Sequence, residues 1–147
     1  MSIYPKLLLI QAELKAPKSQ YNNFGKYNYR NCEDILETLK PLMTKYGATV
    51  LLDDEIININ NRFYVKATAH FIDTESGEQI TTSAFAREEE NKKGMDGSQV
   101  TGASSSYARK YALNGLFCID DTKDSDTLNN SKEYTAPPKA QKQPTKP

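Results

Sequence analysis

The spacing of apolar residues changes along the chain, and it predicts two helices, then strands, then a further helix. In residues 3–15 apolar side chains recur at helical spacing, namely at Ile3, Leu7, Ile10 and Leu14. Ser2 is a candidate N-cap, and the helix should end before Pro17. This pattern predicts a short N-terminal helix with one buried face.

Residues 32–46 show the clearest helical stripe. Asn31 can cap this helix, and Gly47 is placed to end it. Pro41 lies inside the pattern, so we expect a kink there or a tightened preceding turn. The apolar stripe consists of Ile35, Leu36, Leu39, Leu42, Met43 and Tyr46.

Residues 48–90 change to period two, which is typical of half-buried strands. Asparagines at 58, 60 and 61 and the segment from Thr74 to Gly77 supply turns, so an antiparallel three-stranded meander is predicted. The open face of its second strand should carry Arg62, Lys66 and His70. We interpret His70 as an ordinary member of a solvated face, because no nucleophile or metal partner is near it in the sequence.

The segment from Gly97 to Asp126 is predicted to be a helix that breaks at Asn114–Gly115 and ends in four aspartates. At 100° per residue Val100, Ala103, Tyr107, Ala108 and Tyr111 share one side, which makes both tyrosines candidate core anchors. The other side carries Ser98, Gly102, Ser105, Ser106 and Arg109, with Lys110 at the border. This bare side suits a phosphate backbone or a neighbouring subunit. Packing against the sheet is the alternative, but it does not account for Arg109.

These elements predict an α+β fold, in which a three-stranded antiparallel β-meander packs on a long helix and two helices precede it. We expect one domain over residues 1–126. Residues 127–147 contain few apolar residues and end in a proline- and lysine-containing run, so a disordered tail is predicted there.

The composition indicates the cellular compartment of the protein more clearly than it indicates the function. The 19 basic and 19 acidic residues balance, so any nucleic-acid binding must come from local clustering of charge. Cys32 and Cys118 lack the spacing of a metal site and are too few for a disulfide framework. No apolar run approaches the length of a membrane span. We therefore expect a soluble protein in a reducing compartment.

Local clustering does occur in residues 15–30, KAPKSQYNNFGKYNYR. Cations neutralise phosphates and aromatic rings stack on unpaired bases, so this mixture suits a single strand of nucleic acid. The alternative is a loop whose aromatic rings fill the core. The cations are Lys15, Lys18, Lys26 and Arg30, and the rings are Tyr21, Phe24, Tyr27 and Tyr29.

Catalytic motifs are absent from the sequence: it has no phosphate-binding glycine loop, dinucleotide fingerprint, Cys/His cluster or nucleophile elbow. No cofactor is expected. The aspartates at 120, 121, 124 and 126 allow a metal-dependent nuclease as an alternative, although their spacing misses the calcium-loop pattern. A solvated acidic helix end, or a contact with a basic patch on another subunit, is the simpler interpretation.

Three segments resemble signatures of the essential recombination function family of phage single-strand annealing proteins. They are FGKYNYR (24–30), DILETLKPLMTKY (34–46) and SYARKYALNGLFCIDD (106–121), and the resemblance covers about residues 3–126. The third is the most specific, since it combines tyrosine, a basic pair, an apolar block and paired aspartates in one order. Larger members carry a longer C-terminal region, so partner functions housed there are expected to be absent or reduced here.

The resemblance implies a non-enzymatic protein of phage recombination and DNA repair in the bacterial cytoplasm. It would bind single-stranded DNA, anneal complementary strands without ATP and form a homo-oligomeric ring or filament. Host single-strand binding protein and a phage exonuclease are the implied partners. The predicted DNA-binding residues are Lys26, Tyr27, Tyr29, Arg30, Arg62, Lys66, Arg109 and Lys110. A passive single-strand coating protein is the other binding alternative.

Overall fold

The computed structural model of the chain describes residues 2–88 and 97–120, except for the side chains of residues 97–101. The described residues belong to two compact units. Of the described residues, 2–15, 35–88 and 97–119 form the first unit, and 16–34 and 120 belong to the second. The predicted tail, residues 127–147, lies outside the described residues, and so do the aspartates at 121, 124 and 126.

The first helix, α1 (Ile3–Glu13), confirms the expected N-terminal helix and ends two residues earlier than its pattern suggested. Ile3 and Ile10 are buried on the predicted apolar face. Lys6 is buried as well, because its ammonium group meets the Asp73 carboxylate at 2.6 Å. It also donates to the Gly47 carbonyl at 3.2 Å. This ion pair fastens α1 to the end of the sheet.

The second helix, α2 (Cys32–Tyr46), has the predicted bounds. Asn31 and Asp34 cap it reciprocally. The Asn31 side-chain oxygen accepts from the Asp34 backbone amide at 2.9 Å, and the Asn31 backbone amide donates to the Asp34 carboxylate at 3.0 Å. Gly47 ends the helix with φ +72°, a left-handed conformation that favours glycine. The helix continues through Pro41.

The sheet consists of β3 (Ala48–Ile59), β4 (Arg62–Asp73) and β5 (Gln79–Arg87), paired antiparallel in that order. The predicted meander is therefore confirmed. Asn60 and Asn61 both have positive φ between the paired residues Ile59 and Arg62, which is the backbone of a two-residue type I′ hairpin turn.

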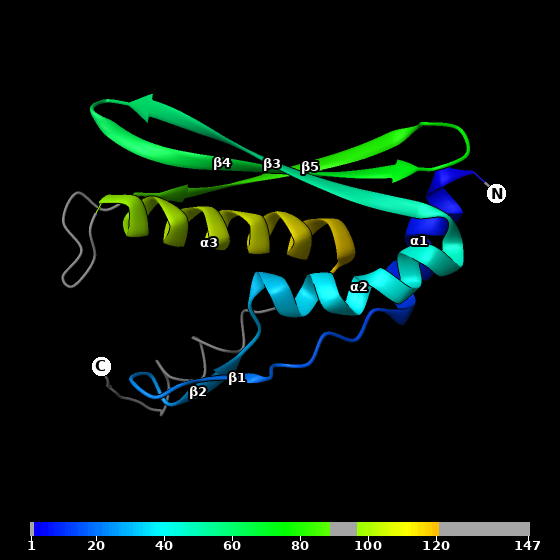
Figure 1. Ribbon diagram of the computed structural model, residues 1–147, viewed down its shortest axis with the longest axis horizontal. Coiled ribbons are helices and arrows are strands. Elements are labelled where there is room, and N and C mark those ends of the chain that lie inside the picture. Colours follow the sequence, from blue (N-terminus) through cyan, green and yellow to red (C-terminus); the bar gives the residue numbers. More distant parts are fainter. Residues whose placement is uncertain (1, 89–96, 121–147) are drawn as a thin grey trace. The chain divides into compact units, whose positions relative to one another are not determined.

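The long helix α3 (Gly97–Phe117) runs along one face of the sheet, against β4 and β5 (Figure 1). Its buried row is made of small residues followed by a leucine: Ser104, Ala108, Ala112 and Leu116. The predicted break at Asn114–Gly115 is wrong. The helix ends later, where Cys118 adopts φ +59° and the Ile119 amide donates to the Asn114 carbonyl at 3.0 Å.

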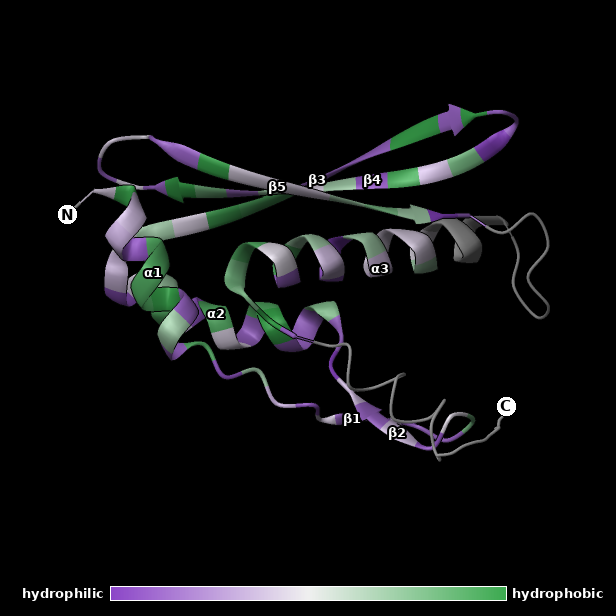
Figure 2. Ribbon diagram, turned by 180° about the vertical axis from the view of Figure 1, so that it is seen from behind, coloured by the Kyte–Doolittle hydropathy of each residue, from purple (hydrophilic) through white to green (hydrophobic). Residues whose placement is uncertain are grey.

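Gly115 allows this continuous helix to approach the sheet. A Cβ at Gly115 would lie 3.2 Å from the Thr82 Cγ2 on β5, so the position suits a residue without a side chain. At the same end of the helix Phe117 packs edge-on against Phe71 of β4, with ring centroids 5.9 Å apart. The hydropathy colours alternate along the strands, as expected for a sheet covered on one face (Figure 2).

In the second unit the basic aromatic segment forms a hairpin, which its sequence pattern did not predict. Strand β1 (Gln20–Asn22) pairs antiparallel with β2 (Tyr27–Tyr29). The turn between them contains Phe24 and Gly25. Among the described helices of the chain, none combines the length and the apolar character needed to cross a membrane.

Candidate nucleic-acid interface

Two tyrosines and a lysine form an exposed cluster on α3. Tyr107 and Tyr111 lie one turn apart, 53% and 47% exposed, with ring centroids 6.0 Å apart and planes 18° from parallel. The Lys110 ammonium group lies 5.9 Å from the first ring and 5.7 Å from the second. The expectation that these tyrosines anchor the core is therefore wrong. The small-residue row of α3 occupies the core instead.

Arg109 points to a different neighbour. Its guanidinium Nε and Nη2 each donate to a carboxylate oxygen of Asp54 on β3, both at 3.0 Å. Ser105, one turn earlier, also donates to Asp54. Partial burial opposes ionisation of Asp54, yet the bonds from Arg109 and Ser105 hold its pKa below the ordinary value. The sheet-packing alternative thus accounts for Arg109 as well as for the serine.

The basic pair of α3 is divided between these two environments. At 100° per residue, Ser105 and Arg109 lie on one flank of the buried row, whereas Tyr107 and Tyr111 lie on the other. Gly102 and Ser106 are exposed, and a Cβ at Gly102 would meet nothing within 4 Å. The bare side of α3 is therefore narrower than predicted and is bordered by Lys110.

The open face of the sheet carries the second group of predicted residues. Arg62 and Lys66 lie there on β4, but register places Glu55 of β3 opposite Lys66. The Lys66 ammonium group lies 6.0 Å from the ring centroid of Phe85 on β5. The face therefore mixes both signs of charge with exposed apolar side chains, including Leu51 and Phe85.

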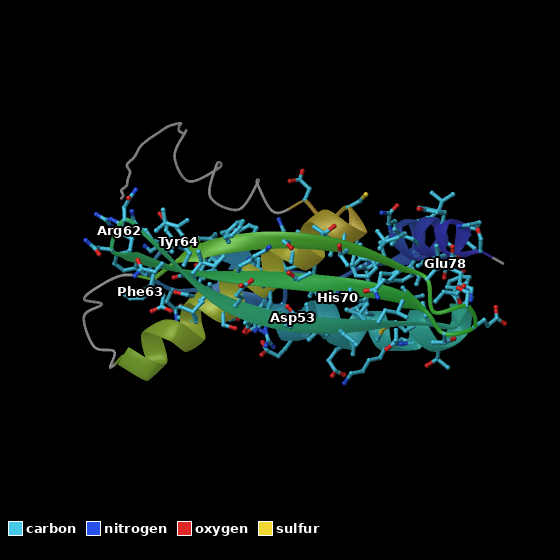
Figure 3. The ribbon with its side chains drawn as sticks, turned by 90° about the horizontal axis from the view of Figure 1, so that it is seen from above. Asp53, Arg62, Phe63, Tyr64, His70 and Glu78 are labelled. Atoms are coloured by element: carbon cyan, nitrogen blue, oxygen red, sulfur yellow. The ribbon has the colours of Figure 1, made fainter. Side chains whose placement is uncertain are left out.

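His70 bridges the strands on the same face. Its Nε2 lies 2.7 Å from a carboxylate oxygen of Asp53, and its Nδ1 lies 3.0 Å from the Gln79 side-chain oxygen. Figure 3 shows Asp53 and His70 on neighbouring strands, with Arg62 near the turn at one end of the sheet. The bonds to Asp53 and then Gln79 raise the pKa of His70 above its ordinary value.

The hairpin of the second unit holds the remaining predicted residues. Lys26 is exposed in the turn, whereas Tyr27 and Tyr29 are half-buried with ring centroids 6.0 Å apart. Arg30 donates through Nε to the Ala16 carbonyl at 2.8 Å. The turn also presents Phe24, which is 98% exposed. This ring belongs to the aromatic set of residues 15–30 but not to the predicted DNA-binding residues.

Within the first unit the predicted residues do not form one continuous patch. Arg62 and Lys66 lie on the open face of the sheet, and Arg109 and Lys110 belong to the helix that covers the opposite face. The described residues contain no group of three or more metal-ligating side chains. Three of the four clustered aspartates lie outside the described residues, so the structure does not test the nuclease alternative.

Comparison with known proteins decides the family. The family model of the ERF superfamily matches residues 3–147. The chain belongs to the ERF superfamily. It is also 58% identical over 138 residues to the essential recombination function protein of Salmonella phage P22. The aligned region covers 94% of this chain and 65% of that relative, so the chain spans less than two thirds of the relative's length. No solved structure matches the chain.

Membership of the ERF superfamily confirms the resemblance drawn from the three motifs. The most specific of them, residues 106–121, includes the exposed Tyr107–Lys110–Tyr111 cluster and also Arg109. One signal in the sequence of α3 was available to predict the exposure of these tyrosines. Small residues repeat every fourth position from Ser104 to Ala112, and such a row permits closer packing on a sheet than a row of tyrosines.

Proposed function

We propose that this chain binds single-stranded DNA and anneals complementary strands without ATP, as part of phage homologous recombination. The observation that carries the proposal is the exposed Tyr107–Lys110–Tyr111 cluster, in which a cation lies within 6 Å of two solvent-facing rings. A lysine attracts phosphate, and tyrosine rings stack on unpaired bases without sequence preference. The name of the phage P22 relative, essential recombination function protein, supports the same process.

The charge of α3 favours an anionic ligand. From Gly97 to Phe117 the sequence contains Arg109 and Lys110 but no acidic residue. Arg109 pairs with Asp54, whereas Lys110 lies over the rings of the exposed cluster. One lysine per subunit neutralises few phosphates, so stable binding requires several subunits along one strand.

A homo-oligomeric ring or filament is therefore part of the proposal. Among the described strands, β3 and β5 each have a single partner in the three-stranded sheet, and their outer edges are available for pairing. Leu51, Ile59 and Phe85 are exposed apolar side chains on the open face. Sedimentation velocity with and without an oligonucleotide tests this assembly, and a monomer under both conditions would contradict it.

The proposed annealing needs no hydrolysis. Base pairing itself releases on the order of 1.4 kcal/mol per stacked step. The protein would hold strands by their phosphates, screen their repulsion and raise the local concentration of the second strand. We assign this activity to residues 1–126. Host single-strand binding protein and a phage exonuclease are the proposed partners, and the bacterial cytoplasm is the proposed location.

Binding is tested with a labelled oligonucleotide in single-stranded and duplex form over a series of salt concentrations. Fluorescence anisotropy should show preferential binding of the single strand, and its affinity should fall linearly with salt on logarithmic axes. Equal affinity for duplex, or no binding at low salt, would contradict the proposal.

A further inference from the structure

The turn of the β1–β2 hairpin presents an aromatic ring almost entirely to water. Phe24 is 98% exposed, the highest value among the exposed large apolar side chains of the described residues. Fully burying a phenylalanine side chain is worth about 1.5–3 kcal/mol, so a partner that covers this ring gains affinity. An exposed phenylalanine can also result from a disordered turn, and the local hydrogen bonds decide between these explanations.

Those hydrogen bonds hold the turn in one conformation. The Asn22 side-chain oxygen accepts from the amides of Phe24 and Gly25, at 2.9 and 3.0 Å. The Lys26 amide donates to the Asn22 carbonyl at 2.7 Å, and Lys26 has φ +57°. The Asn22 Nδ2 donates to the Tyr27 hydroxyl at 3.1 Å. The single side chain of Asn22 therefore fixes both the turn and the following strand.

Gly25 allows the next ring to close against the turn. A Cβ at Gly25 would lie 2.3 Å from Cε1 of Tyr27, so no other residue fits without moving that ring. The outcome is an ordered tip in which Tyr27 packs inward and Phe24 points outward. Because the tip is ordered before binding, little conformational entropy is lost when a ligand covers the ring.

The charge around the tip indicates the chemistry of that ligand. Residues 15–30 contain four basic side chains and no acidic one. Lys26 is exposed two residues from Phe24, and Tyr21 on β1 is 53% exposed. An exposed apolar ring with an exposed lysine two residues away, in a segment without acidic residues, fits a ligand that combines an uncharged flat surface with an anionic backbone. Unpaired nucleotides have this combination.

We propose that Phe24 stacks on an unpaired base of the bound single strand, with Lys26 contacting the adjacent phosphate. This assignment rests on the proposed single-strand binding and extends it to a residue outside the predicted set. The tip would then separate consecutive bases of the strand and hold one base away from its neighbour. Asn22 is a positioning residue for this contact, since it acts through the turn.

The test uses the absence of tryptophan from the chain. In Phe24→Trp the only indole is at the tip, and stacking on a base quenches its fluorescence. Titration with an oligothymidine should quench this emission with the same midpoint as the anisotropy of a labelled strand. Tyr4→Trp, at an exposed position of α1, is the matched control and should keep its emission.

Affinity provides the second readout. Phe24→Ala should weaken binding of the oligothymidine about 5- to 150-fold, the range expected for loss of one stacked base, with an unchanged salt slope. Lys26→Ala should instead lower the salt slope by about 0.7. Asn22→Ala should weaken binding while the ring remains present. Circular dichroism checks folding, which the exposure of Phe24 predicts to be unaffected by its replacement.

Three results would overturn the assignment and identify what is wrong. If the labelled strand binds but the indole emission and the Phe24→Ala affinity are unchanged, Phe24 is not a stacking residue and the proposed function stands. If the emission shifts with protein concentration in the absence of DNA, the ring is covered by a second copy of the chain. If the wild-type chain binds no oligothymidine, the proposed function itself fails.

Discussion

Arg109 of α3 clamps Asp54 of β3 through two parallel hydrogen bonds of 3.0 Å. Planar guanidinium and carboxylate groups match in this arrangement, which ties the helix on the face of the sheet to the edge strand β3. Arg109 is adjacent to Lys110 in the sequence, but the two side chains take up separate tasks in the structure. Arg109 therefore helps to hold α3 in position, whereas the proposed function assigns a phosphate contact to Lys110.

A double-mutant cycle should show that Arg109 and Asp54 are coupled in their contribution to the free energy of unfolding. We expect Arg109→Ala and Asp54→Ala each to destabilise the fold. The destabilisation of the double mutant should be smaller than the sum of the two single effects by about 0.5–1 kcal/mol. This coupling energy is at the upper end of the range for partly exposed ion pairs, because the geometry is bidentate. Urea unfolding measures all four proteins. Additive effects on the free energy of unfolding would mean that the Arg109–Asp54 pair does not stabilise the packing of α3.

Lys110→Ala should weaken single-strand binding and lower its salt slope by about 0.7, the change expected for one lost phosphate contact. Lys40→Ala is the matched control, because Lys40 is an exposed helical lysine of α2 paired with Glu37. Anisotropy titrations at several salt concentrations measure the slopes. If the two variants have equal slopes, Lys110 is not a phosphate contact.

The regular part of the fold was predictable because local signals agreed with one another. The bounds of α2 follow from Asn31, its apolar stripe and Gly47, and the β3–β4 turn follows from paired asparagines. The orientation of α3 was not predictable in the same way. Its flanking tyrosines are as apolar as a core row, and the row of small residues that includes the buried Ser104 and Ala108 was the signal that favoured the opposite orientation. The partner of Arg109 lies 55 residues away, at a distance in sequence that periodicity does not reach.

Two glycines of α3 should respond differently to alanine. Gly102→Ala should stabilise the chain by about 0.8–1 kcal/mol, because helix propensity improves and the new Cβ meets nothing. Gly115→Ala should gain less or lose stability, since its Cβ would lie 3.2 Å from the Thr82 Cγ2. Adding Thr82→Ser removes that methyl group and should restore the gain. Thermal unfolding measures the stability of all three variants. Equal effects at both glycines would contradict the close packing of Gly115 against Thr82.

Gly102→Ala also tests the bare side of α3. If a DNA backbone or a second subunit approaches Gly102 closely, the added methyl group should weaken binding or assembly although the fold becomes more stable. Oligonucleotide affinity and sedimentation of the same variant provide these readouts. Unchanged values would limit the contact on α3 to the Tyr107–Lys110–Tyr111 cluster.

The buried Lys6–Asp73 pair predicts acid sensitivity. The hydrogen bond from Lys6 lowers the pKa of Asp73 to about 2, whereas an unfolded aspartate titrates near 3.9. The unfolded state therefore takes up the proton first, and this contribution to stability is complete above about pH 4 and lost as the pH falls towards 2. Asp73→Asn should be less stable than the wild type at neutral pH, and the difference should shrink over that range. Urea midpoints measured from pH 2 to 7 test this, with Glu37→Gln as the control. A constant difference would show that Asp73 does not titrate in this way.

His70 should titrate above its ordinary pKa of 6.5. Its raised pKa means that the bond to Asp53 contributes stability below about pH 6.5 and that this contribution is lost as the pH rises through the folded value. His70 is the single histidine of the chain, so one pair of ring resonances reports on it in an NMR titration. Asp53→Asn should return the pKa towards 6.5, and an unchanged titration would show that Asp53 is not the cause.

The central claim is annealing, and one assay tests it directly. Two complementary oligonucleotides carrying a fluorophore and a quencher are mixed with the purified chain, without ATP and with or without magnesium. We predict that pairing is faster than in the absence of protein, that it needs no nucleotide, and that the strands remain intact on a denaturing gel. Slower pairing despite tight binding would identify a passive coating protein. Cleaved strands in the magnesium arm would identify a nuclease.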